Sequence, residues 1–130
     1  MSQEIFLEKS TMIVSETDTK GKIIYANNDF CKISGFTKDE LIGQPHNIVR
    51  HEDMPKDAFK DLWTTVSEGK TWKGFVKNKT KNGGFYWVNA TVYPVTKKDG
   101  SKRYISVRTK PNKDEIEKIQ KLYISLKGKQ

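Results

Sequence analysis

The polar segment from Gln44 to Pro55 has the residue types best suited to binding a ligand. It lies between two stretches with helical patterns, and binding residues occur on such connections more often than within regular elements. Arg50 offers a planar fork of donors that suits a phosphate, while His51 and Asp53 can orient this fork or bind a ribose hydroxyl. A structural alternative stays open, in which Asp53 only caps the helix that follows and the two histidines are surface residues.

Asn78 is a second candidate, because it belongs to a strand-like alternation. Trp72 and Val76 fall on the same face as Asn78, so this amide faces the core if they do. Burial of an amide side chain lowers the stability of the folded protein by about 1–3 kcal/mol unless the amide forms its hydrogen bonds. The edge of a flavin ring, with alternating carbonyl and N–H groups, would make them. Alternatively, Asn78 lies at the strand end beside a turn and is solvated.

Alternation also divides the two strands that follow, although it does not show which face is the inner one. The first face carries Tyr86, Val88, Ala90, Val92, Tyr104, Ser106 and Arg108. The second carries Trp87, Asn89, Thr91, Tyr93, Ile105 and Val107. If the small residues Val88 and Ala90 line a pocket, the second face exposes an apolar patch that needs cover from the terminal helix or from a partner.

Short elements must position these residues. We expect a lead-in over 1–11, followed by a hairpin of two strands over 12–14 and 22–26. A short helix capped by Asn27 should follow over 27–33, and then a helical turn over 37–43 that opens with a Thr37/Glu40 capping box. A longer helix begins at Pro55 and stops at Gly69. Its core-facing stripe comprises Ala58, Phe59, Leu62, Trp63 and Val66.

The period then changes to two, over 71–80, 85–96 and 102–110, which indicates three antiparallel strands. After Pro111, Asn112 and Glu115 open a last helix. Its apolar stripe comprises Ile116, Ile119, Leu122, Tyr123 and Leu126, and it either lies back on its own sheet or pairs with another chain. The fold class is therefore α+β: a five-stranded antiparallel sheet over 12–110 with short helices on one face, and a C-terminal amphipathic helix or linker over 111–130.

Length and composition restrict the function further. The 130 residues suffice for one domain, and the single Cys31 cannot form an internal disulfide. No apolar run can span a bilayer, no secretory signal is evident and no Cys/His set has zinc spacing, so we expect a cytoplasmic protein without a metal site.

The net charge of +8 divides into −3 over residues 1–70 and +11 over 71–130. Most of these lysines alternate with apolar residues, which favours a solvated sheet face over a nucleic-acid surface.

Nothing in the sequence indicates an enzyme. No Gly-x-Gly-x-x-Gly follows a strand, and no pair of nucleophile and base stands out. Gly69-Lys70-Thr71 lacks the upstream glycine of a phosphate loop, since position 64 is a threonine.

Across most of its length the sequence resembles a PAS domain, and more narrowly the FAD-binding PAS sensor of bacterial aerotaxis receptors. The resemblance covers about Thr17 to Thr109, and the block from Gly43 to Pro55 is its most specific part. The matching residues are Tyr25–Asn27, Phe30, Ser34–Phe36, Glu40–His46, Arg50, His51, Asp53–Pro55, Trp63, Trp72–Gly74, Lys77, Asn78, Asn82, Gly83, Tyr86–Val88 and Ser106–Thr109.

This resemblance implies FAD bound between the helices and the sheet, in a sensor of redox state or oxygen for energy taxis. Arg50, His51 and Asp53 would support the cofactor and Asn78 would lie near its ring. Trp72, Trp63 and Asn27 would help to wall the pocket. Arg108 would face inward, where its charge favours an anionic reduced flavin.

The signal would pass through the sheet to a chemoreceptor or another signalling protein, and a homodimer through the outer sheet face or the terminal helices is possible. The aerotaxis receptors continue into a membrane anchor and a methyl-accepting coiled coil, and neither follows Gln130. We therefore expect either a separate receptor for the signal or a longer protein that contains this sensor.

Two other cofactor states stay open. One is a haem-binding PAS sensor with His46 or His51 as axial ligand, and the other is a PAS interaction module without a cofactor. A light sensor that works through a cysteine adduct is disfavoured, because Cys31 belongs to the early helix and not to the loop before the longer one.

Overall fold

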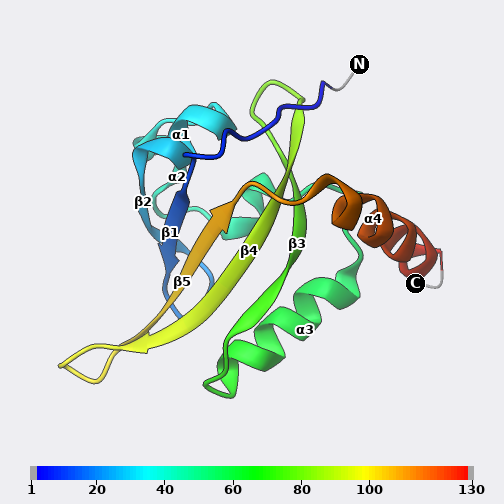
Figure 1. Ribbon diagram of the computed structural model, residues 1–130. Coiled ribbons are helices and arrows are strands. Elements are labelled where there is room, and N and C mark those ends of the chain that lie inside the picture. Colours follow the sequence, from blue (N-terminus) through cyan, green and yellow to red (C-terminus); the bar gives the residue numbers. More distant parts are fainter. Residues whose placement is uncertain (1–2, 129–130) are drawn as a thin grey trace.

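The computed structural model describes residues 3–128, and Figure 1 shows one antiparallel sheet with helices around it. Residues 1–2 of the expected lead-in and 129–130 of the expected terminal segment lie outside this range. The strands are β1 (Ile13–Thr17), β2 (Ile23–Ala26), β3 (Trp72–Lys79), β4 (Phe85–Thr96) and β5 (Lys102–Thr109), in the sheet order β2-β1-β5-β4-β3. The helices are α1 (Asn28–Ser34), α2 (Lys38–Leu41), the 3-10 helix η1 (His46–Val49), α3 (Lys56–Ser67) and α4 (Lys113–Lys127). The predicted element order and α+β class are confirmed.

Local signals set the ends of the short helices. The side chain of Asn27 accepts a hydrogen bond from the backbone N–H of Phe30, and Gly35 ends α1 in the left-handed region at φ 81°. Thr37 and Glu40 form the reciprocal capping box predicted for the next helix. These caps hold two helices that are too short to be stable alone.

Helix α3 differs from its prediction at the N-terminus. Pro55 is the N-cap residue rather than the first helical residue, and no side chain caps this end. Asp53, the alternative cap, instead pairs with Lys77 on β3, with its Oδ2 2.7 Å from Nζ. On the predicted stripe only Val66 is fully buried, and three of the half-buried members, Phe59, Leu62 and Trp63, line a cavity.

Strand parity grouped the residues of each face, and the structure shows which face is the inner one and forms the core. Trp72, Val76 and Asn78 of β3 are all buried. The same is true of Tyr86, Val88, Ala90 and Val92 of β4 and of Tyr104 and Arg108 of β5. The polar members of this set mark the part of the core where a ligand site can form.

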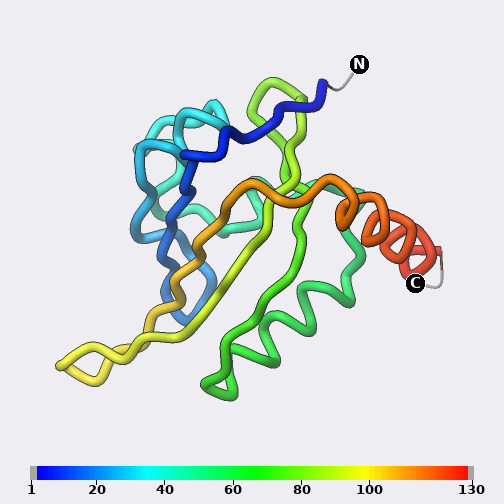
Figure 2. The backbone as a smooth tube through the Cα atoms, viewed as in Figure 1, coloured from blue at the N-terminus to red at the C-terminus, as the bar shows by residue number. Residues whose placement is uncertain are grey.

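Helix α4 packs through Tyr123 on the outer face of its own sheet, which is one of the two predicted arrangements. Figure 2 shows the chain leaving β5 and crossing over β4 and β3 before it reaches α4. The Tyr123 hydroxyl donates to the Phe75 carbonyl oxygen at 2.7 Å, and its ring stacks on Trp87 at 6.2 Å between centroids. Trp87 is thereby covered. Leu122 is 50% exposed, so the predicted apolar stripe of α4 is only partly buried.

Candidate functional site

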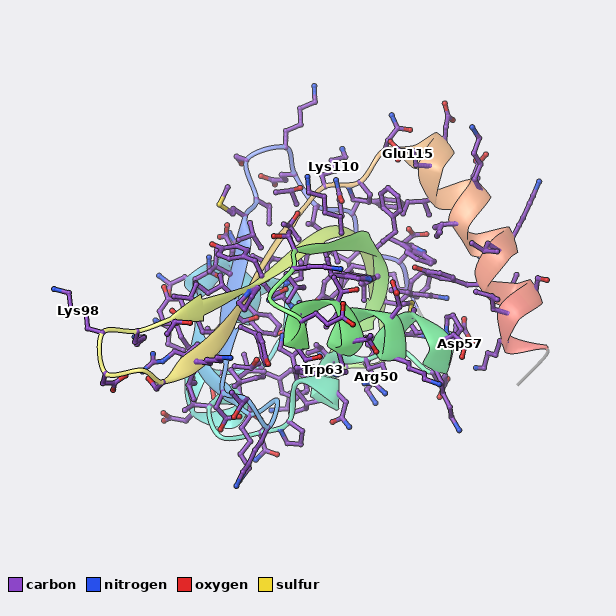
Figure 3. All side chains as sticks on the ribbon, turned by 90° about the horizontal axis from the view of Figure 1, so that it is seen from below. Arg50, Asp57, Trp63, Lys98, Lys110 and Glu115 are labelled. Atoms are coloured by element: carbon purple, nitrogen blue, oxygen red, sulfur yellow. The ribbon has the colours of Figure 1, made fainter. Side chains whose placement is uncertain are left out.

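A cavity of about 250 Å³ lies between the inner face of the sheet and the helical side of the domain. Its walls come from β3, β4 and β5, from the turn between β1 and β2, and from η1 and α3. Four of the eight predicted site residues line it: Arg50, Trp63, Asn78 and Arg108. Figure 3 labels Arg50 and Trp63 on the side of the domain where α3 lies. The fold therefore brings together residues from the polar segment, α3, β3 and β5.

Asn78 faces this cavity, as its parity with Trp72 and Val76 predicted. Its side chain is 3% exposed, and its Nδ2 has no hydrogen-bond partner among the described residues. Backbone pairing with Arg50 holds it in position, because the polar segment runs antiparallel beside β3 at this point. A buried amide donor without a partner costs free energy in the folded protein, so this group favours a ligand that accepts its hydrogen bond.

Arg108 is a buried cation with no carboxylate partner among residues 3–128. It is 2% exposed, donates from Nη2 to the Ser15 hydroxyl at 2.6 Å and lies 3.4 Å through Nη1 from Nε2 of His46. Its guanidinium lies 4.5 Å from the centroid of the Phe30 ring, and its Nε has no hydrogen-bond partner. Burial lowers the pKa of Arg108 to about 10, so the side chain is still positive at neutral pH.

His46 is neutral in this setting. Burial, together with the charges of Arg108 and Arg50, lowers the pKa of His46 to about 3. Its Nε2 lies 3.0 Å from the Ser15 hydroxyl and its ring stacks on Phe30. His46, Ser15 and Arg108 therefore form one polar cluster that joins η1, β1 and β5.

Arg50 joins the cavity from the polar segment. Its guanidinium lies 3.7 Å from the centroid of the Phe59 ring on α3, and its buried Nε has no hydrogen-bond partner in the described part of the chain. Burial lowers the pKa of Arg50 from its ordinary value. A fixed, positively charged fork at the cavity wall suits an anionic or carbonyl-rich ligand.

His51 and Asp53 lie outside the cavity lining. The Nδ1 atom of His51 accepts the backbone N–H of Asp53 at 3.0 Å, and its ring meets Phe85 edge-on. Partial burial and the charge of Lys77 lower the pKa of His51. The pKa of Asp53 is lowered as well, mainly by its hydrogen bond to Lys77. Both residues tie the polar segment to β3.

Trp72 and Asn27 join elements of the fold to one another. The Trp72 indole N–H donates to the Asp61 carboxylate of α3 at 2.8 Å, which ties the helix to the sheet. Asn27 accepts the Val14 N–H at 3.0 Å and donates to the Met12 carbonyl, which joins α1 to β1. Neither side chain lines the cavity.

The cavity also includes residues that the sequence analysis did not assign to the site. Ser106 follows from the parity of Arg108, and Tyr104 lies on the same face and stacks edge-on with Trp63 at 5.5 Å. Lys20 and Asn47 carried no signal in the sequence, because a loop position does not show which way a side chain points.

These features define the protein as a small α+β domain with a cavity, lined by polar, aromatic and aliphatic residues, between its helices and one antiparallel sheet. Residues 23–108 match the PAS fold family, and the chain belongs to that family. The predicted membership of the PAS family is therefore confirmed, and so is the narrower resemblance to an aerotaxis receptor. The chain is 45% identical over 120 residues to the aerotaxis receptor of Escherichia coli (strain K12), a match that covers 92% of this chain and 24% of the receptor.

A more distant relative is the nitrogen fixation regulatory protein of Klebsiella oxytoca, 29% identical over 94 residues, which are 72% of this chain and 19% of that protein. The chain thus spans a quarter or less of the length of these relatives. In the described part of the chain, no helix has the length and apolar character needed to span a membrane.

Solved structures show the same fold at low sequence identity. The light-state structure of the blue-light photoreceptor Aureochrome1 LOV has a TM-score of 0.72 at 18% identity, over 92% of this chain and 93% of that chain. A LOV domain studied with a flavin analogue has a TM-score of 0.70 at 18% identity, over 85% and 83% of the two chains. At this identity the comparison supports the fold alone.

Proposed function

We propose that this PAS domain binds FAD in the cavity and acts as a redox or oxygen sensor in bacterial energy taxis. The observation that carries the proposal is the inward Asn78, whose buried Nδ2 lacks a partner inside a cavity lined by Arg50 and Arg108. The named relatives agree with it, since one is an aerotaxis receptor and a structural neighbour is a LOV domain with a flavin analogue.

The residues of the cavity fit a flavin. The buried donor atoms Asn78 Nδ2, Arg50 Nε and Arg108 Nε all lack partners, and the edge of a flavin ring offers acceptors to such donors. Trp63 and Tyr104 offer aromatic surface to a planar ring. When bound, FAD supplies a reversible redox centre. The positive charge of Arg108 would favour the more negatively charged form of the bound group.

The route of the signal would begin at Asn78 and end on the outer face of the sheet. A change in hydrogen bonding at Asn78 would shift β3 at this point. Because the neighbouring residue Lys77 pairs with Asp53 on the other face, the shift would also reach that face. That face is also where α4 packs, through Tyr123 and Phe75. We propose a chemoreceptor or another signalling protein as the cytoplasmic recipient, with no catalytic step in this domain and no nucleic-acid partner.

Haem is the weaker cofactor. His46 lines the cavity, but its Nε2 is engaged by Ser15 and lies beside the positive Arg108, which disfavours coordination of a metal cation. His51 lies outside the lining. A PAS module without a cofactor leaves three buried donors at the cavity unexplained.

Release and identification of the cofactor test this proposal. We expect denatured protein, purified from cells that make FAD, to release FAD at close to one mole per mole. FMN or haem in its place would assign the cavity to another cofactor. If cells supply flavin and the purified protein neither carries FAD nor binds it when it is added, the proposal is wrong.

A further inference from the structure

The mouth of the cavity carries a positive side chain that the proposed function does not use. Lys20, in the turn between β1 and β2, is exposed to solvent and yet lines the cavity, together with Arg50 and Arg108. None of the described residues that form this lining is Asp or Glu. The neighbouring Asp18 uses its Oδ1 to accept the backbone N–H groups of Lys20 and Lys22, both at 2.9 Å. The lining therefore favours an anionic ligand.

The turn that carries Lys20 is fixed to the segment that carries Arg50. The backbone N–H of His46 donates to the Gly21 carbonyl at 3.0 Å, and that of Ile23 donates to the Gln44 carbonyl at 2.9 Å. Gly21 has φ +83°, and a Cβ placed on it would lie 3.4 Å from the Trp63 indole. The turn thus packs closely against α3 and its backbone is bonded to the segment that carries Arg50, so Lys20 and Arg50 lie on adjoining parts of the cavity lining.

We propose that Lys20 and Arg50 form an anion-binding rim that takes the phosphate groups of a phosphorylated flavin, an inference that rests on the flavin-binding function proposed above. Asn78 and Arg108 lie deeper, so the ring would occupy the interior and the phosphates the mouth. An arginine fork gives directional hydrogen bonds and a lysine ammonium gives an adjustable point charge, which together suit a phosphate group. Lys20 is then a specificity residue that separates FAD and FMN from riboflavin, which has no phosphate.

Calorimetric titration of the full chain, freed of bound flavin, with FAD, FMN and riboflavin tests this proposal. Lys20→Gln is compared with the matched control Lys22→Gln, which removes the same charge from an exposed side chain near the same turn that does not line the cavity. We expect Lys20→Gln to weaken FAD and FMN binding about three- to tenfold. Riboflavin binding should stay within about twofold of wild type, and Lys22→Gln should leave all three affinities within about twofold.

The outcomes separate this inference from the function on which it rests. If wild-type protein binds none of the three flavins, the proposed function is wrong. If flavins bind but Lys20→Gln leaves FAD unchanged, weakens riboflavin equally or behaves like Lys22→Gln, the rim is wrong while flavin binding stands. Added salt should weaken FAD binding to wild type more than to Lys20→Gln, and an equal salt dependence would also contradict the rim.

Discussion

The Asp53 carboxylate lies 2.7 Å from the Lys77 ammonium on the outer face of β3, one residue away from the inward-facing Asn78. Because successive residues of a strand point to opposite faces, Lys77 holds the ion pair on one face of β3 while Asn78, the next residue, lines the cavity on the other. Lys77 is the more buried partner, with 9% of its side chain exposed against 59% for Asp53. The pair therefore fixes β3 beside the site from the side on which α4 packs.

Replacement of Asp53 tests this relationship. Asp53→Asn leaves the ammonium of Lys77 largely buried without its anion, and we expect the free energy of unfolding to fall by about 1 kcal/mol, since Asp53 itself is well exposed. Urea denaturation measures the change. Glu52→Gln is the control, because it removes the same charge from the adjacent exposed residue, and it should stay within about 0.5 kcal/mol. Equal effects of the two variants would contradict a specific role for the ion pair.

Asn78→Ala separates ligand binding from folding. We expect flavin affinity to fall about 10- to 100-fold, because the variant removes a hydrogen bond to the bound ring. The flavin-free protein should still fold, with a loss of stability on the order of 1 kcal/mol, because the Asn78 side chain also interacts with the Tyr86 hydroxyl. Fluorescence titration with FAD measures the affinity. Asn89→Ala, on the exposed face of β4, should bind FAD like wild type. Wild-type affinity in Asn78→Ala would contradict the assignment of Asn78 to the site.

Helix α4 should loosen when Tyr123 loses its hydroxyl. Tyr123→Phe removes the hydrogen bond to the Phe75 carbonyl, which contributes about 0.5–1.5 kcal/mol, while the ring can still stack on Trp87. Amide hydrogen exchange in α4 should then accelerate roughly three- to tenfold if the helix opens as a local unit. Tyr25→Phe, a change of the same kind at a tyrosine that is 44% exposed, should leave α4 unchanged. Unaltered exchange in Tyr123→Phe would show that this bond does not hold the helix.

Stability should fall as the pH decreases from about 6.5 toward 3, because of His46. In that window the unfolded chain protonates this histidine, whereas the folded protein keeps it neutral with a pKa of about 3. The stabilisation is fully present above pH 6.5, and we expect a loss on the order of 2 kcal/mol between about pH 7 and pH 5. His51, whose pKa is also lowered, adds to this loss.

Urea denaturation at several pH values measures this dependence. His46→Gln should make it clearly shallower above about pH 5, leaving the contribution of His51, because the lowered pKa values of Asp53 and Glu40 matter little there. A variant with the same pH dependence as wild type would contradict a neutral, buried His46.

Local sequence signals predicted most of the fold. Caps such as Asn27 and the alternation of Trp72, Val76 and Asn78 depend on neighbouring residues, so the sequence alone reveals them. It also revealed that Arg108 faces inward, through its match to the PAS pattern. What it could not reveal is which distant residue each inward side chain meets.

The polar cluster illustrates that limit. Ser15 and Arg108 are 93 positions apart, and their hydrogen bond depends on the pairing of β1 with β5. Trp72 was expected at the pocket wall, yet its indole N–H is directed to Asp61 on α3. The predicted inward face of Trp72 was correct. Its hydrogen-bond partner depends on how α3 packs on the sheet, which no local sequence pattern encodes.

The absorbance spectrum of the purified protein, recorded oxidised and then after anaerobic addition of dithionite, tests the central claim most directly. We expect the two absorption bands of a protein-bound flavin in the oxidised sample, their bleaching on reduction and their return in air. A Soret band would show that the cavity holds haem instead. A protein that shows no flavin bands, even after incubation with excess FAD and removal of the unbound cofactor, would contradict the assignment of a flavin sensor.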